Sequence, residues 1–469
     1  MGHIQFVLIF DFVRPHAATP IKRVTEDAGK GKKEKQVNDR GETEMNENVL
    51  EKLKILAESA KYDVSCSSSG TTRKGKAGAL GSTAGWGICH SFTEDGRCVS
   101  LLKIMLTNHC LYDCAYCVNR RSNDLRRATF TVEELVNLTL EFYRRNYIEG
   151  LFLSSGVLNS PDYTMERMMR VVKELRTVHR YNGYIHLKAI PGASQALIDE
   201  AGLYADRMSV NIEIPTEENL KYLAPEKDHK TVFQPMRSIQ QGIVRYQEEK
   251  QKYHHVPRFV PAGQSTQMIV GATSETDSQI LRLSSSLYNK AAMRRVYYSG
   301  YIPVNEYDKR LPALKQAPLV RENRLYQADW LMRFYQFGVN EIVDDQFPNL
   351  DLTIDPKLSW ALRHPEFFPV DINKADYAKI LRVPGIGVKS AKLIVVARKH
   401  GYLDAEKLKK IGVVMKKAQY FITCRQLPAF TVQEATPEYV RKVLTTKPTG
   451  KKNVPSNQLS ILFLEEPET

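Results

Sequence analysis

Along the middle of the chain, segments with the apolar pattern of a β-strand alternate with segments that have the apolar pattern of a helix. Between residues 99 and 302, short apolar runs of strand type alternate with segments whose apolar residues recur every three or four positions. The predicted strands cover residues 99–107, 150–156, 184–190, 207–214, 265–272 and 294–302. The predicted helices between them cover residues 131–146, 165–180, 196–204, 216–224 and 276–291. This alternation predicts βαβ units, a parallel sheet and right-handed crossovers.

Six predicted strands are too few to close an eight-stranded barrel. We therefore expect an α/β fold with a partial, open (β/α)6 barrel over residues 99–305. Residues 306–365 have the pattern of a helical linker, in which Trp330, Phe334 and Trp360 are expected packing anchors. A small all-α domain is expected over 366–430, and a helix with a flexible tail over 431–469.

The pattern before the barrel differs from that of the barrel. Residues 22–44 are charged and poor in apolar residues, which predicts disorder. The following "MNENVLEKLKILAESAKYD" predicts an amphipathic helix that begins near Met45. We expect residues 1–44 to be a disordered extension or a mis-called start, with Met45 as the natural first residue. Residues 45–98 are expected to form this helix and a Gly/Ser-rich loop.

The composition and net charge of the chain indicate what class of partner it binds and in which cellular compartment it works. The chain has 469 residues and a formal net charge of +14, which suggests a polyanionic partner, nucleic acid first. Seven cysteines are too few for a secreted disulfide framework, so a reducing, cytoplasmic setting with thiolate ligands is expected. No run approaches the ~20 apolar residues that span a membrane, so no membrane contact is expected.

Three cysteines crowd into the stretch "CLYDCAYC", as Cys110, Cys114 and Cys117. Three thiolates can hold three irons of a [4Fe–4S] cluster and leave the fourth iron open to a substrate or cofactor. The motif directly follows the first predicted strand, at the strand end where parallel α/β folds place their active sites. A zinc knuckle with His109 or Asp113 as fourth ligand, or unligated core cysteines, are the alternatives.

This motif, with Tyr116 before the last cysteine, resembles the C-x3-C-x-aromatic-C signature of the radical S-adenosylmethionine (SAM) superfamily. The resemblance covers about residues 99–305. It implies that Cys110, Cys114 and Cys117 hold a [4Fe–4S] cluster whose open iron chelates SAM. It also implies that SAM is cleaved to a 5′-deoxyadenosyl radical, which abstracts hydrogen from a substrate. Tyr116 would pack near the adenine, and an electron donor such as flavodoxin or ferredoxin would be needed.

The same resemblance points to further SAM-binding positions. The end of the second strand usually offers a glycine-rich turn to the SAM amino group; here it reads Ser154-Ser155-Gly156, without the usual acidic residue. In the fourth strand Asn211 and Glu213 point to one face and are expected to bond the ribose. The alternative is two polar groups on a solvated barrel interior.

Two other loops are weaker candidates. After the fifth strand, "GATSETD" predicts a helix start capped near Thr273 or Ser274, close to the adenine or the carboxylate of SAM. The upstream stretch 65–98 contains Cys66, Cys89, His90 and Cys98 in no recognised metal-binding spacing. It is expected either to cover the active site, to hold a second metal, or to be a flexible lead-in.

The C-terminal stretch "LRVPGIGVKSAKLI" has a tight turn with Pro384, Gly385 and Gly387 between two helical segments. It resembles a helix-hairpin-helix, a DNA-binding unit. Its glycines would let the chain approach a phosphate, and Lys389 would add charge. A degenerate second copy, "LKKIGVVMKKA", places Gly412 on Gly385 but has a valine at the second glycine position.

Charge in this region supports a nucleic-acid partner. Residues 382–418 contain ten Lys or Arg against two acidic residues. A small helical packing or protein-interaction domain is the alternative. The barrel motif, the upstream "GICHSF…DGRC" and this module together resemble bacterial radical SAM proteins described as DNA modification or repair enzymes. That resemblance implies a DNA partner and an association with a uracil-DNA-glycosylase-like protein, but no catalytic residue or reaction.

Three other functions remain open at this point. One is a radical SAM enzyme that modifies RNA, such as tRNA. Another is a helix-hairpin-helix DNA glycosylase with a structural Fe–S cluster, because Lys389 stands where such enzymes keep a catalytic lysine. Their cluster, however, follows the motif and uses four cysteines. The last is a non-catalytic DNA-binding protein with a redox-sensing cluster.

Overall fold

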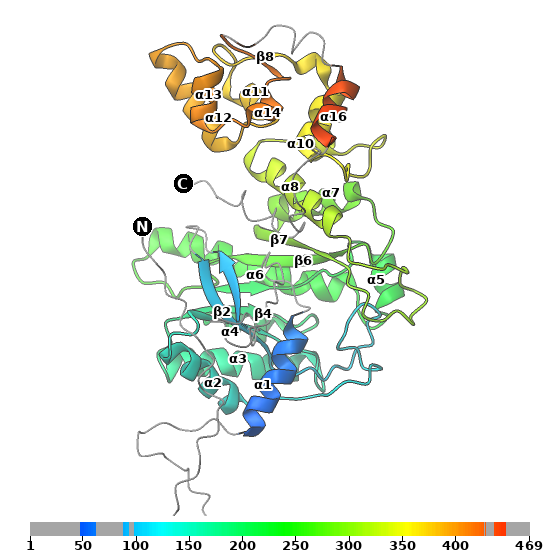
Figure 1. The fold of residues 1–469 in the computed structure, drawn as a ribbon. Helices are drawn as coiled ribbons and strands as arrows, with labels where there is room; N and C mark the ends of the chain where they lie inside the picture. Colours follow the sequence, from blue (N-terminus) through cyan, green and yellow to red (C-terminus); the bar gives the residue numbers. More distant parts are fainter. Residues whose placement is uncertain (1–46, 62–87, 93–97, 426, 428–435, 447–469) are drawn as a thin grey trace, which may run out of the picture.

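The structure, a computed structural model, describes residues 47–61, 88–92, 98–425, 427 and 436–446. Figure 1 shows two units: an α/β unit, and a smaller helical unit that stacks on it through α8 and α10. Three predicted features lie outside the described residues: the extension 1–44, most of the Gly/Ser-rich loop with Cys66, and the tail after residue 446.

The α/β unit contains one sheet whose strands are neighbours in sequence order, β1 to β7. Its strands are β1 (Ile88–Phe92), β2 (Cys98–Met105), β3 (Gly150–Ser154), β4 (Tyr184–Lys188), β5 (Arg207–Ser209), β6 (Gln264–Val270) and β7 (Met293–Gly300). Strands β2 to β7 are parallel, which confirms the predicted α/β half-barrel. The hairpin partner β1, antiparallel to β2, is a seventh strand that the apolar pattern did not predict.

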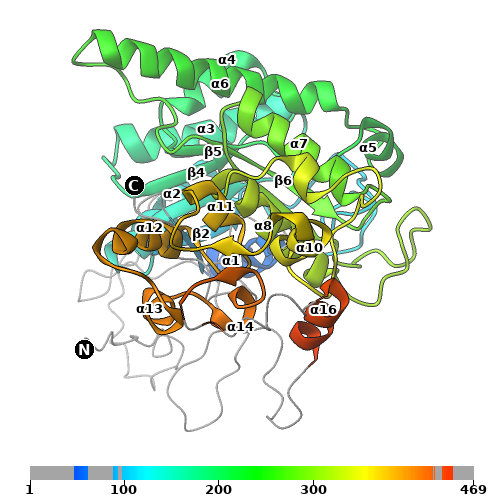
Figure 2. The same ribbon diagram turned by 90° about the horizontal axis from the view of Figure 1, so that it is seen from above.

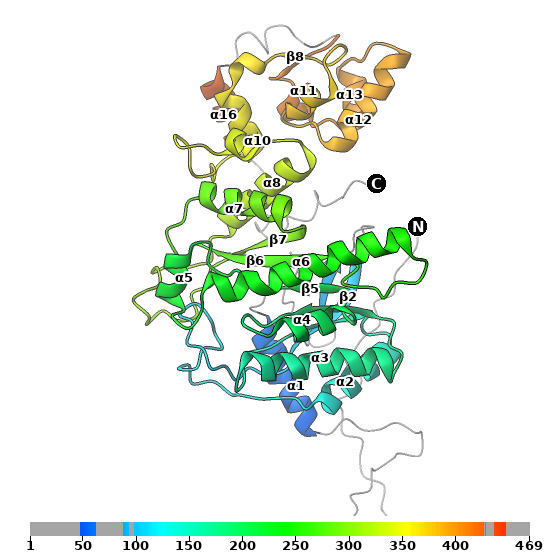
Figure 3. The ribbon, with the colours of Figure 1, turned by 180° about the vertical axis from the view of Figure 1, so that it is seen from behind.

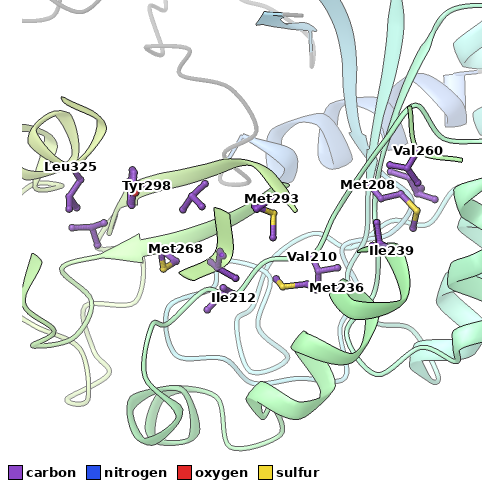
Figure 4. Close-up of a cluster of buried hydrophobic side chains, with 14 of the residues drawn as sticks. Met208, Val210, Ile212, Met236, Ile239, Val260, Met268, Met293, Tyr298 and Leu325 are labelled. Carbon is purple, nitrogen blue, oxygen red and sulfur yellow. The ribbon is translucent and has the colours of Figure 1, made fainter. Parts of the chain in front are cut away.

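The two faces of the sheet differ in polarity because side chains alternate along each strand. One face presents apolar residues such as Leu102, Leu151, Ile185 and Met208, each at most 1% exposed, to the covering helices. Figure 4 shows part of this layer, where side chains from Met208 to Leu325 follow one another along the sheet. The opposite, concave face is largely polar.

Most of the covering helices lie on one side of the sheet, as Figure 3 shows for α3, α4 and α6. The helices of this unit are α1 (Glu47–Ala60), α2 (Val132–Arg144), α3 (Pro161–Thr177), α4 (Gln195–Gly202), α5 (Glu217–Leu223), α6 (His229–Lys252) and α7 (Asp277–Lys290). The long helix α6 was not predicted; it contains Pro235 and many polar residues. The cap predicted at Thr273 or Ser274 was wrong, because Thr276 caps α7 in a capping box with Gln279.

The connecting segment after β7 is helical, as its pattern predicted. It contains α8 (Leu319–Phe334), α9 (Val339–Ile342) and α10 (Pro356–Arg363). Trp360 is 2% exposed and packs edge-on against Phe337 and Phe367, so it is the anchor that the sequence indicated. Trp330 and Phe334 stack edge-to-face on each other.

The C-terminal unit consists of two helical hairpins with a small sheet, which Figure 2 shows from above. Its elements are β8 (Val370–Asp371), α11 (Tyr377–Arg382), α12 (Val388–Ala397), α13 (Ala405–Ile411), α14 (Met415–Ala418), β9 (Ile422–Thr423) and α16 (Pro437–Thr445). The expectation of an all-α domain was wrong in one respect, because β8 and β9 pair in parallel. Among the described helices, none is both long and apolar enough to cross a lipid bilayer.

Candidate functional site

The three clustered cysteines lie in the loop after β2, at the carboxyl end of the parallel strands. Cys114 is buried, and Cys110 and Cys117 are partly buried; all three are free thiols. Burial, and then the neighbouring thiols Cys114 and Cys110, raise the pKa of Cys117 to about 12. The three sulfurs therefore share one poorly solvated region, as a common cluster would require.

An arginine fixes the middle of this loop. Arg120 donates to both carboxylate oxygens of Asp113, at 3.0 and 2.7 Å, and to Asp308 at 2.7 Å. These hydrogen bonds hold the pKa of Asp113 well below its usual range. Because both oxygens of Asp113 are engaged by Arg120, this carboxylate is not available as the fourth zinc ligand. Arg310 also pairs with Asp308, at 2.7 Å.

A buried amide and a partly buried guanidinium satisfy the loop's carbonyls. Asn305 is fully buried and donates to the carbonyls of Ala115 at 2.6 Å and Cys117 at 3.0 Å. Arg127 donates to four further carbonyls of the segment 108–123. In Figure 1 this cyan segment lies beside α5, consistent with the 2.7 Å bond from the Ala115 N–H to the carbonyl of Leu223. The loop is thus held by residues from the beginning and the end of the half-barrel.

Tyr116 is 9% exposed and lies beside Lys227, which follows α5. The Lys227 ammonium lies 3.4 Å from the Tyr116 hydroxyl and 5.8 Å from its ring centroid. Burial raises the pKa of Tyr116, while Lys227 lowers it and Cys114 and Glu213 raise it. Lys227 and Glu213 are therefore both close to Tyr116.

The end of β3 packs directly against the cysteine loop. The Gly156 N–H donates to the carbonyl of Thr107 at 2.8 Å, and a Cβ on Gly156 would lie 2.3 Å from the carbonyl oxygen of His109. Ser155 bonds the neighbouring carbonyl of Gly156 at 2.7 Å. Ser154 is 1% exposed, and its hydroxyl bonds none of the residues that the structure describes. The predicted Ser-Ser-Gly turn therefore places a buried hydroxyl, unpartnered among the described residues, at the carboxyl end of β3.

Asn211 and Glu213 lie in the continuation of β5, which ends earlier than predicted. The Asn211 amide donates to Gln267 at 3.0 Å. Glu213 adopts a left-handed φ of 65°, and its carboxylate lies 3.9 Å from the Lys188 ammonium. The structure thus brings Glu213 near the cysteine loop, whereas the ribose role of both residues stays a prediction.

These residues fit a [4Fe–4S] cluster with bound SAM. The donor set is three thiols without a fourth protein sulfur in the loop, and Lys227 offers a cation to an anionic cluster or carboxylate. The unpartnered Ser154 hydroxyl offers a hydrogen bond to a ligand at the same strand end. Because Gly156 has no side chain, the end of β3 and the cysteine loop can lie close together. A Cβ at this position would clash with the backbone of the loop.

The two C-terminal hairpins are packed against each other at their turns. The Val414 N–H donates to the carbonyl of Gly385 at 2.9 Å, and a Cβ on Gly385 would lie 2.7 Å from the carbonyl oxygen of Val414. Gly385 also has a φ of 88°, and Gly412 ends α13 with a φ of 95°. Gly385 is thus required by the turn and by hairpin packing; a contact with phosphate stays a prediction.

The first hairpin presents a helix start and a lysine. Gly387 is the N-cap residue of α12, Pro384 is buried in the preceding turn, and Lys389 is exposed on the first turn. The Tyr335 hydroxyl lies next to this helix start, 3.6 Å from the position that a Cβ on Gly387 would take.

The ten Lys and Arg residues of 382–418 divide into two groups by their contacts. Arg382 pairs with Glu341 at 2.7 Å, Arg398 donates to the carbonyl of Ile372 at 3.2 Å, and Lys417 pairs with Asp355 at 2.7 Å. These three bind within the protein. The others are exposed, namely Lys389, Lys392, Lys399, Lys407, Lys409, Lys410 and Lys416. Of these, Lys407 also donates to the carbonyl of Tyr402 at 2.9 Å and lies 3.5 Å from Asp404.

Sequence reasoning missed Asn305, Arg127 and Lys227. Their contacts with the cysteine loop span up to 190 residues, so no local pattern marks them. Of the upstream group, Cys89 is buried on β1 against Leu101 and Phe152. The side chains of His90 and Cys98 lie outside the described residues.

Comparison with protein families gives two matches. Residues 104–242 match the radical SAM superfamily, and residues 367–420 match the helix-hairpin-helix motif. Both resemblances seen in the sequence are confirmed, and the first match indicates an enzyme whose domain uses a [4Fe–4S] cluster and SAM. No curated protein sequence matches the chain.

Solved structures of radical SAM proteins resemble the chain only weakly. HydG, a maturase of the [FeFe]-hydrogenase, has 14% identity and a TM-score of 0.37, over 49% of this chain and 48% of that one. Methylornithine synthase (PylB) has 16% identity and a TM-score of 0.35, over 47% of this chain and 60% of that one. Coproporphyrinogen III oxidase (HemN) from Escherichia coli has 13% identity and a TM-score of 0.30, over 55% and 56%. The chain thus spans about half the length of these proteins, and at such scores nothing of their function is transferred.

Proposed function

We propose that this chain, an enzyme with a radical SAM domain, acts on nucleic acid, and on DNA in particular, in modification or repair. The observation that supports the proposal most strongly is that one polypeptide contains both the cysteine loop and the helix-hairpin-helix unit. A cluster-type cysteine loop lies at the carboxyl end of a half-barrel, and a paired helix-hairpin-helix unit with exposed lysines is joined to it through α8 and α10.

In the proposed mechanism, Cys110, Cys114 and Cys117 hold the cluster as thiolates. When bound, the cluster and SAM supply a 5′-deoxyadenosyl radical that abstracts a hydrogen atom from substrate. Tyr116 would pack against the adenine of SAM, and the Ser154 hydroxyl would form a hydrogen bond with the methionine part of SAM. The buried loop keeps these groups in place and excludes water.

Asn211 and Glu213 are proposed to bond the ribose hydroxyls of SAM. The Asn211 amide is already oriented by Gln267. Glu213 is held by backbone bonds on both sides, from its own N–H to Gln267 at 3.0 Å and from the Ile269 N–H to its carbonyl at 2.6 Å. This preorganisation supports a binding role rather than a solvated one.

The C-terminal unit is proposed to hold the phosphate backbone. Exposed lysines on α12, α13 and α14 provide sequence-independent attraction. Pro384, Gly385, Gly387, Lys389 and Gly412 form or flank the two turns that would face the backbone. A target base in a duplex must leave the stack before its hydrogen can reach the barrel.

SAM cleavage tests the enzymatic half of the proposal. Anaerobically reconstituted protein with dithionite should convert SAM to 5′-deoxyadenosine and methionine, and Cys114→Ala should abolish this. Cys424→Ala is the matched control, because Cys424 is a free thiol of the C-terminal unit. Protein that retains its cluster but cleaves no SAM would refute a radical SAM activity on DNA and on RNA alike.

Competition binding tests the choice of nucleic acid. Duplex DNA should displace labelled duplex at lower concentrations than tRNA does, over a titration of salt. Preferential binding of tRNA would replace DNA with RNA as the substrate. Mass spectrometry of nucleosides from anaerobic reactions with damaged DNA would then identify the product.

The remaining partners and the compartment are part of the proposal. A reductant such as flavodoxin or ferredoxin would supply the electron, and a uracil-DNA-glycosylase-like protein would act in the same pathway. The described cysteines are free thiols, which fits a reducing compartment such as the cytoplasm. Pull-down from anaerobic lysate with the reconstituted enzyme would test both partners.

A further inference from the structure

The turn between α5 and α6 places a lysine against the cysteine loop. The Ala115 N–H of the loop donates to the carbonyl of Leu223, at the end of α5, at 2.7 Å. The Asp113 N–H donates to the Glu226 carboxylate at 3.3 Å. Lys227 is the next residue along the chain. Its backbone is therefore fixed relative to the loop by bonds on either side of Cys114.

Two tyrosine rings of the loop hold the side chain of Lys227. Its ammonium lies 5.9 Å from the ring centroid of Tyr112, 5.8 Å from that of Tyr116, and 3.4 Å from the Tyr116 hydroxyl. An aromatic ring attracts a cation to its face, and two rings together restrict where the cation can lie. Tyr112, Cys114 and Tyr116 pack in one hydrophobic cluster. The ammonium is therefore held beside the cysteines.

The positive charge of Lys227 acts on two of the three thiols. Burial raises the pKa of Cys114 and of Cys117, and the charge of Lys227 works against this rise at both sulfurs. The interaction is favourable whenever the sulfurs, or a group bound to them, carry negative charge. Lys227 is therefore placed to stabilise an anionic group that the cysteine loop holds.

No carboxylate among the described residues forms an ion pair with Lys227. Of the carboxylates around it, Glu213 lies 3.9 Å from Lys188, and Glu226 lies 4.0 Å from Arg121. The side chain of Lys227 is nonetheless partly buried. Burial of an ammonium without a counter-ion is costly, and an anion bound beside it offsets that cost. A cluster held by the neighbouring thiolates would be such an anion.

We propose that Lys227 raises the reduction potential of the [4Fe–4S] cluster held by the three clustered cysteines. This inference rests on the proposed function, because it requires those thiolates to hold a cluster. Reduction adds one electron, which comes from the external reductant, and Lys227 neither gains nor loses a proton. A fixed cation beside the sulfurs stabilises the more negative, reduced state, and charge around a cluster is one of the factors that set its potential.

A redox titration followed by electron paramagnetic resonance tests the proposal on the reconstituted full-length enzyme without SAM. Lys227→Met keeps the apolar stem but removes the charge. The midpoint potential should therefore fall by about 59 mV, which is a tenfold change in the equilibrium of a one-electron couple. Lys227→Arg keeps the charge and should keep a potential close to that of the wild type. A potential in Lys227→Met equal to that of the wild type would overturn the proposal.

Lys221→Met is the matched control, because it removes a lysine from the neighbouring helix α5. Lys221 is exposed and lies 3.5 Å from Glu217, one helical turn away. Its loss should leave the potential unchanged. An equal fall of the potential in Lys221→Met and Lys227→Met would show a general effect of net charge and would overturn the specific role of Lys227.

Iron content decides the test where Lys227→Met takes up no cluster. Lys227→Gln is then titrated in its place, since it is also neutral but keeps a polar group near the Tyr116 hydroxyl. Where neither neutral variant takes up iron, uptake by Lys227→Arg shows that the cysteine loop needs a cation at this position and supports the proposal. Loss of iron in all three variants would show a purely structural role and would overturn it.

Two parallel measurements distinguish the possible failures. Equilibrium dialysis with labelled SAM reports whether Lys227 binds the carboxylate of SAM instead. Weaker SAM binding by Lys227→Met at an unchanged potential would make that assignment and overturn the proposal. SAM cleavage by dithionite-reduced enzyme is assayed on the same samples. A wild type whose potential depends on Lys227 but which cleaves no SAM refutes the proposed function alone, and a wild type without a cluster refutes both.

Discussion

Gly156→Ala probes the contact between the cysteine loop and β3. A Cβ at this position would lie 2.3 Å from the carbonyl oxygen of His109, whereas such contacts essentially never fall under 3.0 Å. The backbone must therefore open by at least 0.7 Å, the difference of these two distances. The obstructing atoms belong to the backbone, so no side chain can rotate away. We expect the substitution to cost about 1–3 kcal/mol, as overpacking does.

The displacement has a second effect, on cluster loading. The Val157 N–H bonds the Cys110 sulfur at 3.5 Å, and the Leu111 N–H bonds the Val157 carbonyl at 2.8 Å. Moving the loop from β3 therefore shifts one of the three thiols. We expect Tm of the apo protein to fall by ~2–4 °C for each kcal/mol lost, and iron per chain after reconstitution to fall as well.

Circular dichroism melts and iron analysis provide the assay, with Gly338→Ala as the matched control. Gly338 has a φ of −73°, and its Cβ would meet only the Glu341 carboxylate, at 3.5 Å. The control should lose less than about 1 kcal/mol and no iron. Gly156→Ala with the Tm and iron content of the control would refute the argument from close packing.

Three further predictions concern other parts of the chain. Asn305→Asp keeps the size of the side chain but removes its N–H donors, so reconstituted iron should fall while helix content stays constant; full loading would contradict this. Burial lowers the pKa of Lys357 from 10.5 to about 7, so between these values the unfolded chain binds a proton that the folded chain lacks. Stability in urea should therefore rise by about 2 kcal/mol from pH 7 to 9, and Lys357→Met should lose this rise. Lys389→Ala with Lys392→Ala should reduce the slope of log affinity for duplex DNA against log salt by ~2 in anisotropy titrations, and an unchanged slope would place the phosphates elsewhere.

The half-barrel could be predicted because its signal is local. The six parallel strands and most helices carry their own apolar period, and sequential strands are neighbours in the sheet. The cysteine motif is equally local, since its three thiols lie within eight residues. Helix α6 was not predicted, because polar residues lie between its buried positions and Pro235 interrupts its apolar pattern.

What the sequence could not show depends on residues that meet only after folding. Asn305 looks like any loop asparagine until the structure brings it to the carbonyl of Cys117. Gly385 was interpreted as a phosphate contact, but its crowding with Val414 appears only when both hairpins are placed together. Similarly, β8 and β9 have two residues each, which is too short for any period.

The ion pair between Arg120 and Asp308 also limits when the cysteine loop can reach its folded conformation during synthesis of the chain. The two residues are 188 positions apart, and the bond from Asn305 to Cys117 spans the same distance. Contacts between residues so far apart in sequence form late in folding, because the entropy of closing a long loop is lost before the contact contributes any stability. A ribosome must therefore have released the whole half-barrel before the thiols acquire their final spacing. Iron and sulfide would then be inserted only after synthesis has passed residue 308 of the 469.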